Sequence, residues 1–338
     1  MKPGIFRLIF RHADGALPNV LALAYALAGY GIGLWLMATA PLPLALAATL
    51  WFAHALIIAA YLFHEFAHNS IFARPAWNRR AGIFMTWLTG GCYARYEHLR
   101  LKHMRHHVDR ADVISLDVKA WLLAGPAWRR QLVLALEWAY VPAVDLLMHA
   151  WVMLLPFMRA ERRAERPRLL AILAVRGTAF ALLAGFAPQG AALYVAAYLV
   201  MVTVLRFADC YQHTYDAFAI LDKDKVPQDK LRDAAYEQAN TYSNLVSVRL
   251  PALNLLLLNF AYHNAHHEEP AVPWHRLPAL HRRLYGSTCA QAIPMAKLLA
   301  PFHRHRTGRV LSEDYGVVDA GNPAAFKGAV AVSFLTAV

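Results

Sequence analysis

Cysteine is scarce in this sequence, and its three copies show no regular spacing. Cys92, Cys210 and Cys289 form no CxxC pair and no dense cluster within the 338 residues. Their scarcity argues against a disulfide framework and against an iron–sulfur cluster held by this chain. We therefore expect three reduced thiols with structural roles.

Nucleotide and haem motifs are also missing. The chain contains no GxGxxG loop and no HPGG-like haem-binding segment. A built-in flavin, nicotinamide or haem site is therefore not expected. If the chain catalyses a redox reaction, its electrons must come from a separate carrier.

Charge is nearly absent from four long apolar runs. Two of them, Val20–Ala40 and Leu44–Phe63, are separated only by Pro41-Leu42-Pro43. The other two, Leu169–Ala187 and Ala191–Ala208, are separated by Pro188-Gln189-Gly190. A run of about 20 apolar residues is long enough to cross a bilayer as a helix. These runs predict two transmembrane helical hairpins with short tips.

The distribution of positive charge predicts the orientation of these hairpins. The net charge is +12, but neither hairpin tip is charged, and arginines gather at the opposite ends of the runs. Cytoplasmic loops carry the excess of Lys and Arg, so we expect the N-terminus and all long polar segments on the cytoplasmic side. Arg176, inside the third run, is expected to snorkel back to that side. This pattern does not predict a nucleic-acid-binding surface. The basic residues behind the orientation are Lys2, Arg7, Arg11, the stretch 74–110, Arg159, Arg162, Arg163, Arg166 and Arg168.

Three shorter apolar segments are not expected to span. Ala81–Ala94 and Pro251–Tyr262 are too short, and the latter is predicted to be a buried or interfacial helix. Gln131–Met158 is long enough but contains several polar residues and prolines, so it predicts one or two interfacial helices.

The predicted fold class is an all-α integral membrane protein, with four spans, interfacial helices and a cytosolic histidine-rich cap. Its expected parts are a cytosolic N-terminus (1–19), the first hairpin (20–63), a cytosolic or interfacial region (64–168), the second hairpin (169–208), a cytosolic cap (209–319) and a tail (320–338), to which we assign no role.

Histidine is abundant, with seventeen copies, and most lie in a few dense groups. His64 and His68 follow the second run with HxxxH spacing, which places both rings on one face of a helix. Two HxxHH groups come later, and a single histidine, His213, follows the fourth run as His64 follows the second. The HxxHH groups are His103, His106 and His107, then His263, His266 and His267.

These nine imidazoles are too many for one metal ion. A tetrahedral zinc takes four ligands and an octahedral ion takes six. Nine histidines therefore fit two ions, although neutral imidazole alone does not choose between iron, zinc, copper and nickel. The segment His64-Glu65-Phe66-Ala67-His68 also matches the HExxH zinc-protease motif, with Glu65 as general base. An intramembrane protease would leave both HxxHH groups unexplained, so we rank that alternative low.

From Leu44 to Pro278 the sequence resembles the membrane fatty acid desaturase family. The three histidine groups match its histidine boxes, and Tyr262–His267 followed by Pro273–Pro278 resembles its third box and the signature downstream. Gln212-His213-Thr214 looks like the additional histidine of that family. The first box has three residues between its histidines where the acyl-CoA branch has four, which weakens the expectation of an acyl-CoA substrate.

The resemblance implies two iron ions held by the nine histidines, with O2 as co-substrate, and attack on an unactivated C–H bond of a lipid chain. Unactivated methylenes offer no acidic proton, and zinc lacks the redox chemistry that iron supplies. Asp209, one turn before His213, is a candidate for orienting a metal-bound water or a ligand imidazole.

The electrons for such a reaction would come from a ferredoxin, rubredoxin or cytochrome. An acidic carrier could dock on basic residues of the cap, although positive-inside bias explains the same residues. These residues are Arg95, Arg100, Lys102, Arg105 and Arg110.

Three other functions compete with lipid desaturation. A hydroxylase or ketolase of a fatty chain, alkane or carotenoid would use the same histidines. The zinc protease is the second alternative. A metal transporter is the third, but it would place its ligands near the middle of the membrane rather than at the ends of spans.

Overall fold

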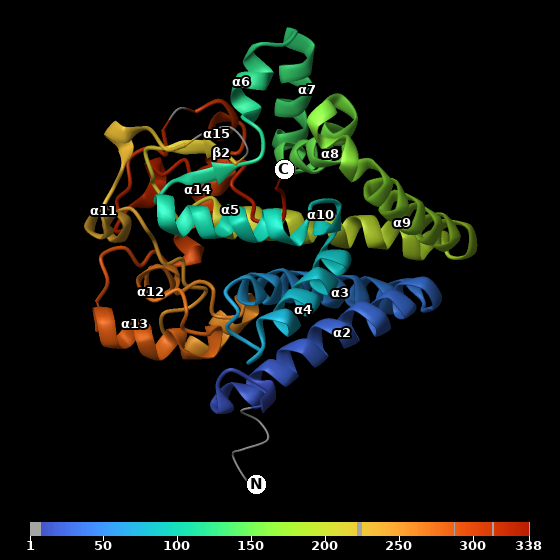
Figure 1. The fold of residues 1–338 in the computed structure, drawn as a ribbon, viewed down its shortest axis with the longest axis horizontal. Coiled ribbons are helices and arrows are strands. Elements are labelled where there is room, and N and C mark those ends of the chain that lie inside the picture. The colour runs from blue at the N-terminus through green and yellow to red at the C-terminus, as the bar shows by residue number, and fades with distance from the viewer. Residues whose placement is uncertain (1–7, 222–224, 287, 313, 338) are drawn as a thin grey trace. The chain divides into compact units, whose positions relative to one another are not determined.

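The computed structural model describes residues 8–221, 225–286, 288–312 and 314–337, and these residues are mostly helical (Figure 1). Lys2 and Arg7, used above for orientation, lie outside the described residues. The chain forms two compact units. The first comprises Met1–Tyr96 and His149–Val204, and the second comprises Glu97–Met148 and Leu205–Val338.

Among the described residues, four helices that lie or begin in the first unit are long and apolar enough to cross a membrane, which confirms the predicted spans. The span-length segments are Ala13–Thr39, Leu42–Ala67, Ala160–Phe186 and Pro188–Asp209, the last continuing into the second unit. Prolines mark the start of the second helix of each hairpin, where the ring fixes φ and a missing N–H costs nothing. The elements are η1 (Ala13–Gly15), α2 (Ala16–Thr39), α3 (Leu42–Ala67), α4 (Pro75–Thr89), η2 (Gly91–Tyr93), η3 (Ala160–Glu165), α9 (Arg166–Phe186) and α10 (Pro188–Asp209).

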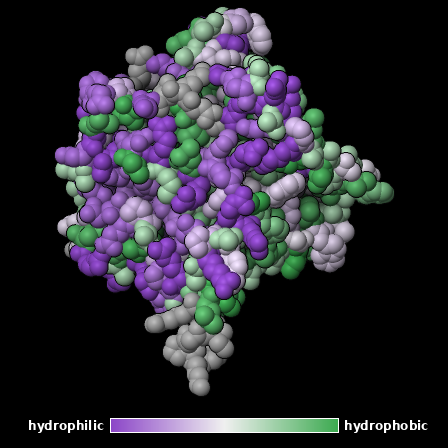
Figure 2. All heavy atoms as spheres, in the orientation of Figure 1, coloured by the Kyte–Doolittle hydropathy of each residue, from purple (hydrophilic) through white to green (hydrophobic). Residues whose placement is uncertain are grey.

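Helices α2 and α3 pack closely because α2 carries glycines at the contact. A Cβ atom on Gly29 would lie 2.5 Å from the Cβ of Ala55, and one on Gly33 would lie 3.1 Å from that of Phe52. Small residues of this kind let two membrane helices approach without a side chain between them. The outer faces of the spans remain apolar, and hydrophobic residues cover the projecting end of α9 in Figure 2.

Arg168 connects α9 to the turn after α4 through three hydrogen bonds. Its guanidinium donates to the carbonyls of Cys92 (2.7 Å), Ala94 (2.9 Å) and Tyr93 (3.1 Å). The turn begins at Gly90, whose φ of +80° ends α4 in the left-handed region. The end of a helix leaves backbone carbonyls without partners. Here the charged guanidinium of Arg168 supplies hydrogen-bond donors to the carbonyls of the turn.

The second unit carries most of the histidines. Its elements are α5 (Tyr96–Asp109), β1 (Asp112–Ile114), α6 (Val118–Leu123), α7 (Ala127–Trp138), β2 (Phe218–Ile220), η4 (Gln228–Lys230), α11 (Ala234–Ala239), η5 (Pro251–Leu257), α12 (His263–Glu268), η6 (Trp274–Arg276), α13 (Leu277–Tyr285), α14 (Met295–Arg304), α15 (Gly308–Leu311) and η7 (Pro323–Ala325); α8 (Ala143–Met158) begins here and ends in the first unit.

Strands β1 and β2 form a short parallel pair that the sequence did not predict. Asp112, Val113 and Ile114 pair with Phe218, Ala219 and Ile220. The pair follows directly after α5 and closely after His213, so it fixes two histidine-bearing segments side by side. A parallel pair joins residues distant in sequence, and three-residue strands carry too little periodicity to detect.

Two of the shorter apolar segments differ in how they compare with their predictions. Gln131–Met158 overlaps α7 and α8, which agrees with the prediction of one or two helices. Pro251–Tyr262 is not one helix. Its first seven residues form η5, and Leu258 and Asn259 then adopt positive φ angles of 48° and 58°. These two left-handed residues end the helix, and the chain then continues into α12.

The tail, given no role above, contributes to the interior of the second unit. Phe326, Leu335 and Ala337 are buried. Lys102 donates to the carbonyls of Ser333 (2.6 Å) and Thr336 (2.9 Å). All three cysteines are free thiols, as predicted, and Cys92 and Cys210 are buried.

A buried ion network joins α7, α8 and α10 within the second unit. Arg206 pairs with Glu137 and, through Nε at 2.6 Å, with Asp145. Glu137 also accepts a hydrogen bond from the backbone N–H of Val144 (2.8 Å). All three charged side chains are at least nine-tenths buried. Each charge therefore depends on its partners for compensation.

Replacing Arg206 with Ala is expected to destabilise the protein by about 3–5 kcal/mol, because two buried carboxylates would lose their cation. Thermal unfolding in detergent measures the change. Arg232→Ala, which removes a largely exposed pair with Asp216, is the matched control and should leave the melting temperature unchanged. Equal melting temperatures for Arg206→Ala and the parent chain would contradict the role of this network.

Candidate metal centre

The second histidine box lies on α5. His103, His106 and His107 occupy one face because residues three and four apart on a helix lie side by side. The Nε2 atoms of His103 and His107 are 3.1 Å apart. The ring of His106 projects to the neighbouring position, with its centroid 5.7 Å from that of His107. One helix thus supplies rings to two adjacent groups of histidines.

The third box lies on α12, a helix of six residues. His263, His266 and His267 are 2%, 1% and 4% exposed, so all three rings face the interior. Asn264, between them, accepts a hydrogen bond from the Ser243 hydroxyl (2.9 Å) and donates to the carbonyl of Thr241. These contacts fix the rotation of the short helix about its axis.

His213 reaches the site from the segment after α10. It forms an isolated antiparallel bridge with Thr241. Backbone hydrogen bonds on either side, from Thr214 N to Asn240 O (3.0 Å) and from Tyr242 N to Gln212 O (2.7 Å), hold this position. His213 therefore lies in a fixed turn rather than on the last turn of the span.

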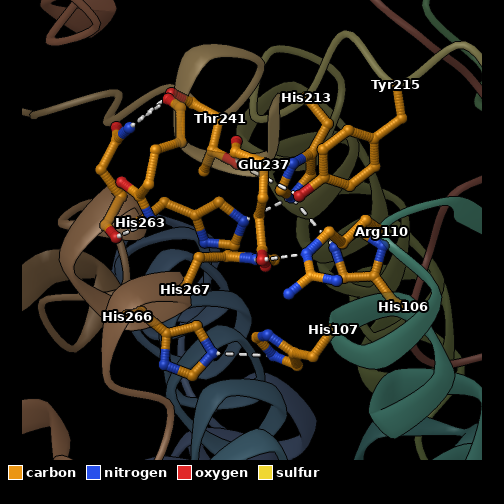
Figure 3. A network of polar contacts seen from close by, with 12 residues as sticks. His106, His107, Arg110, His213, Tyr215, Glu237, Thr241, His263, His266 and His267 are labelled. Atoms are coloured by element: carbon orange, nitrogen blue, oxygen red, sulfur yellow. Dashed lines mark hydrogen bonds and ion pairs between the residues drawn. The ribbon is translucent and has the colours of Figure 1, made fainter. Parts of the chain in front are cut away.

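Four of these rings converge on one point (Figure 3). His106, His213, His263 and His267 each offer a ring nitrogen, and these nitrogens all lie within 4.8 Å of one another. The Nε2 atom of His213 is 3.0 Å from that of His106 and 2.7 Å from that of His263. We name these four residues the first histidine group.

Three rings of the second unit form a neighbouring cluster. The Nε2 atom of His107 is 3.1 Å from that of His103 and 3.2 Å from that of His266. We name these three residues the second histidine group. The predicted ligands of the second unit are thus all brought together, in two adjacent groups.

The two remaining predicted ligands belong to the first unit. His64 lies in the last turn of α3, His68 is the C-cap residue of that helix, and their ring centroids are 4.7 Å apart. Glu65 between them is buried and accepts a hydrogen bond from the Ser70 hydroxyl (2.6 Å). This engagement does not suit the general base of an HExxH protease, which must be available to a metal-bound water.

The nitrogen contacts in both groups are difficult to explain by hydrogen bonds alone. A ring nitrogen has one in-plane position, occupied by either a proton or a lone pair. The Nε2 atoms of His213 and His107 each contact two other Nε2 atoms, so one hydrogen bond cannot satisfy both contacts. A shared cation can accept all of these lone pairs at once.

The separations also suit a metal ion. Two nitrogens at about 2.1 Å from one ion are about 3.0 Å apart when adjacent in an octahedron and about 3.4 Å apart in a tetrahedron. The four shortest separations, 2.7 to 3.2 Å, are compatible with pairs of nitrogens that share one ion. A donor set of neutral imidazoles fits iron among the ions that imidazole suits.

Hydrogen bonds at the Nδ1 atoms direct the lone pairs inward. His106 Nδ1–H donates to the carbonyl of Ala111 (3.0 Å), and His267 Nδ1–H donates to Glu237 (2.8 Å). Thr241 donates its hydroxyl proton to the carbonyl of Glu237 (2.7 Å), so its oxygen accepts from His213 Nδ1–H at 3.3 Å. With Nδ1 protonated, each Nε2 presents its lone pair to the centre of the group.

Burial keeps these rings neutral. It lowers the pKa of His106 to about 4 and the pKa values of His213, His263 and His267 well below the ordinary value. Neighbouring imidazoles depress the pKa of His213, His263 and His267 further. Neutral rings are the form that binds metals, so no proton needs to leave at physiological pH before an ion binds.

Glu237 is a site residue that the sequence analysis missed. One of its carboxylate oxygens accepts from His267 and the other from Arg110 Nε (2.9 Å). Burial raises the pKa of Glu237, and the Arg110 guanidinium opposes that rise. The sequence pointed to Asp209 and Glu65 as carboxylates near the histidines and not to Glu237, because Glu237 lies in a polar segment far from any box.

A cavity of about 50 Å³ adjoins both histidine groups within the second unit. His103, His106, His213 and His263 line it, together with Asp209, Asp112, Lys102 and side chains from the tail. Asp209 is 8% exposed, and among the described residues neither carboxylate oxygen has a hydrogen-bond partner. A space of this size holds a few water molecules or another small molecule.

The basic residues proposed as a docking surface are largely engaged inside the protein. Lys102 is 3% exposed and donates to the tail, so its assignment to that surface is wrong. Burial lowers the pKa of Lys102 to about 7 and raises that of Asp112 to about 7. Arg110 is paired with Glu237, and Arg105 is paired with Asp109 at 2.7 Å. The positions of the basic residues along α5 in the sequence do not indicate which of these side chains face the interior.

A comparison with known families gives a match over most of the chain. The model of the family described as fatty acid desaturase matches residues 39–297, more than half of the chain, including all three boxes and His213. A search of curated proteins finds no significant match.

Proposed function

Because the chain belongs to the fatty acid desaturase family, we propose that it is a membrane-bound, O2-dependent desaturase of a fatty acyl chain that uses two iron ions. Family membership gives an oxidoreductase with a lipid substrate. The observation that carries the finer proposal is the convergence of Nε2 atoms on His213 and on His107, which a shared metal ion explains best.

We assign the nine histidines as ligands of the two ions. His106, His213, His263 and His267 would hold one ion. His103, His107 and His266 would contribute to the other, and His64 and His68 are assigned to it because nine imidazoles exceed the needs of a single ion. Bound iron and O2 would supply the oxidising power that acid–base groups lack against an unactivated C–H bond.

The protein side chains around the histidines have separate tasks. Glu237, Thr241 and the carbonyl of Ala111 hold three rings in the tautomer that directs Nε2 inward. Asp209 lines the cavity, and its oxygens have no hydrogen-bond partner within the part of the chain that the structure describes, so it would accept a hydrogen bond from a water on the metal side and keep that water oriented. The apolar residues of the cavity wall, including Phe260 and Phe334, limit the water that reaches this position.

The placement in the membrane and the electron supply are further parts of this proposal. The charge distribution favours a cytoplasmic location for the N-terminus and the histidine boxes. No nucleotide or haem motif occurs in the sequence, so a separate ferredoxin, rubredoxin or cytochrome would deliver the two electrons of each turnover.

Mass spectrometry of lipids from cells expressing the chain tests the reaction. Desaturation predicts lipid chains that have lost two hydrogen atoms, and these should be absent from cells expressing the His106→Ala variant. A gain of one oxygen atom instead would favour a hydroxylase, and replacement of two hydrogens by oxygen a ketolase. A single bound zinc with no change in any lipid would contradict the di-iron proposal.

A further inference from the structure

The first unit contains a cavity of about 770 Å³ among its membrane-spanning helices. Most of the lining is apolar or aromatic. Cavities of this size usually hold one drug-sized ligand, fixed by a few polar groups in an apolar wall. The wall comes from α2, α4, η2, α9 and α10, and it includes Leu34, Trp87, Leu173, Phe180, Leu183 and Phe186.

One charged side chain, Arg176, faces this cavity. It lies ten residues after Arg166, the first residue of α9, so it is about 15 Å along the helix from that end. Its guanidinium donates to the carbonyl of Trp87 and, at 3.4 Å, to the hydroxyl of Tyr194. Tyr194 is in the first two turns of α10, near the hairpin tip. The guanidinium also lies near Tyr93, in the turn that Arg168 contacts from the start of α9, so the snorkelling of Arg176 stays a prediction.

The charge of Arg176 lacks a carboxylate partner among the described residues. Within this part of the chain it takes part in no ion pair, and its guanidinium lies 5.7 Å from the ring centre of Tyr93. The contact with Trp87 stabilises the C-terminal end of α4 but uses only part of a group that carries five N–H donors. An ionisable residue this far inside a membrane-spanning helix usually binds a ligand or pairs with an opposite charge.

We propose that this cavity binds a single-chain lipid through its carboxylate, the headgroup of a free fatty acid. A planar guanidinium pairs with a carboxylate through two parallel hydrogen bonds, which would neutralise Arg176 inside the membrane. The apolar wall would bury the hydrocarbon chain. The cavity size favours one chain over a two-chain lipid. This site is additional to the histidine groups and does not depend on the proposed reaction.

Native mass spectrometry of the full chain in detergent tests the proposal with palmitate and methyl palmitate as probes. The two probes share the chain and differ in the negative charge. Palmitate should bind at least about tenfold more tightly, as expected for hydrogen bonds to a charged group. The same difference should disappear in Arg176→Gln and be partly retained in Arg176→Lys.

A pair of glycines on α9 offers a matched control that leaves Arg176 intact. A Cβ atom on Gly177 or on Gly185 would meet no atom within 4 Å, so both positions tolerate a larger side chain. Only Gly177 lines the cavity. Gly177→Trp should therefore abolish palmitate binding, whereas Gly185→Trp should bind it like the parent chain.

Three results would overturn the proposal: equal binding of palmitate and its methyl ester, unchanged palmitate binding in Gly177→Trp, or Arg176-dependent retention of two-chain phospholipids alone. Binding is read without iron, O2 or turnover. A chain that binds palmitate but leaves cellular lipids unchanged would contradict the desaturase proposal alone.

Discussion

Replacing His106 or His266 with Ala is expected to abolish product formation and to remove about half of the bound iron. Each ring contributes one nitrogen to a different histidine group, and each group is proposed to hold one ion. Iron per chain, measured by elemental analysis after purification, should fall from about two toward one. Lipid mass spectrometry of the same cells should show no product.

The control for these substitutions is His98→Ala, on the same helix as His106 but outside both groups. It should retain both the iron content and the product. The variants His106→Ala and His266→Ala should still fractionate with membranes, because the spans lie outside α5 and α12. Full activity in either variant, or an iron content equal to that of the parent chain, would exclude the assigned ligand.

Replacing Glu237 with Gln is expected to lower iron affinity or activity by about 10–100-fold, the usual effect of losing a group that orients a metal ligand. The carboxylate accepts from His267 Nδ1–H and so keeps the Nε2 lone pair directed toward the ion. An amide can turn its NH2 group toward Nδ1 instead, which would favour the opposite tautomer. Competition with a chelator measures the affinity, and the rate of product formation measures the activity.

Glu268→Gln is the matched control, because Glu268 is an exposed carboxylate on the third-box helix itself. It should behave like the parent chain. Thr241→Val tests the same principle at His213, and a smaller loss is expected there because the 3.3 Å contact involves a neutral hydroxyl. If Glu237→Gln retains iron as tightly as Glu268→Gln, the carboxylate does not position His267.

Local patterns in the sequence were sufficient for the spans and the histidine boxes. The runs of apolar residues and their proline-rich links predicted both hairpins, because span length and backbone satisfaction in a bilayer leave few alternatives. The HxxHH spacing predicted which rings share a face of α5 and of α12, because helical geometry alone fixes that relation. The same patterns wrongly predicted one helix over Pro251–Tyr262, where η5 ends at Leu257.

Contacts between distant segments were beyond the reach of these patterns. Glu237 meets His267 across thirty residues, and Lys102 meets the carbonyl of Thr336 across more than two hundred. Neither residue has a spacing that marks it. Lys102 looked like a surface charge because its neighbours on α5 are basic, and only its packing against the tail reveals that it is buried.

The sequence by itself determined that the chain carries four span-length apolar runs and three histidine boxes with helical spacing, because residue type and helical spacing are properties of the sequence. Only the tertiary structure decided how the seven predicted ligands of the second unit divide into two groups and which tautomers their partners select. It also decided that Arg176 faces a cavity. These features depend on the directions in which side chains from separate elements point, and folding sets those directions.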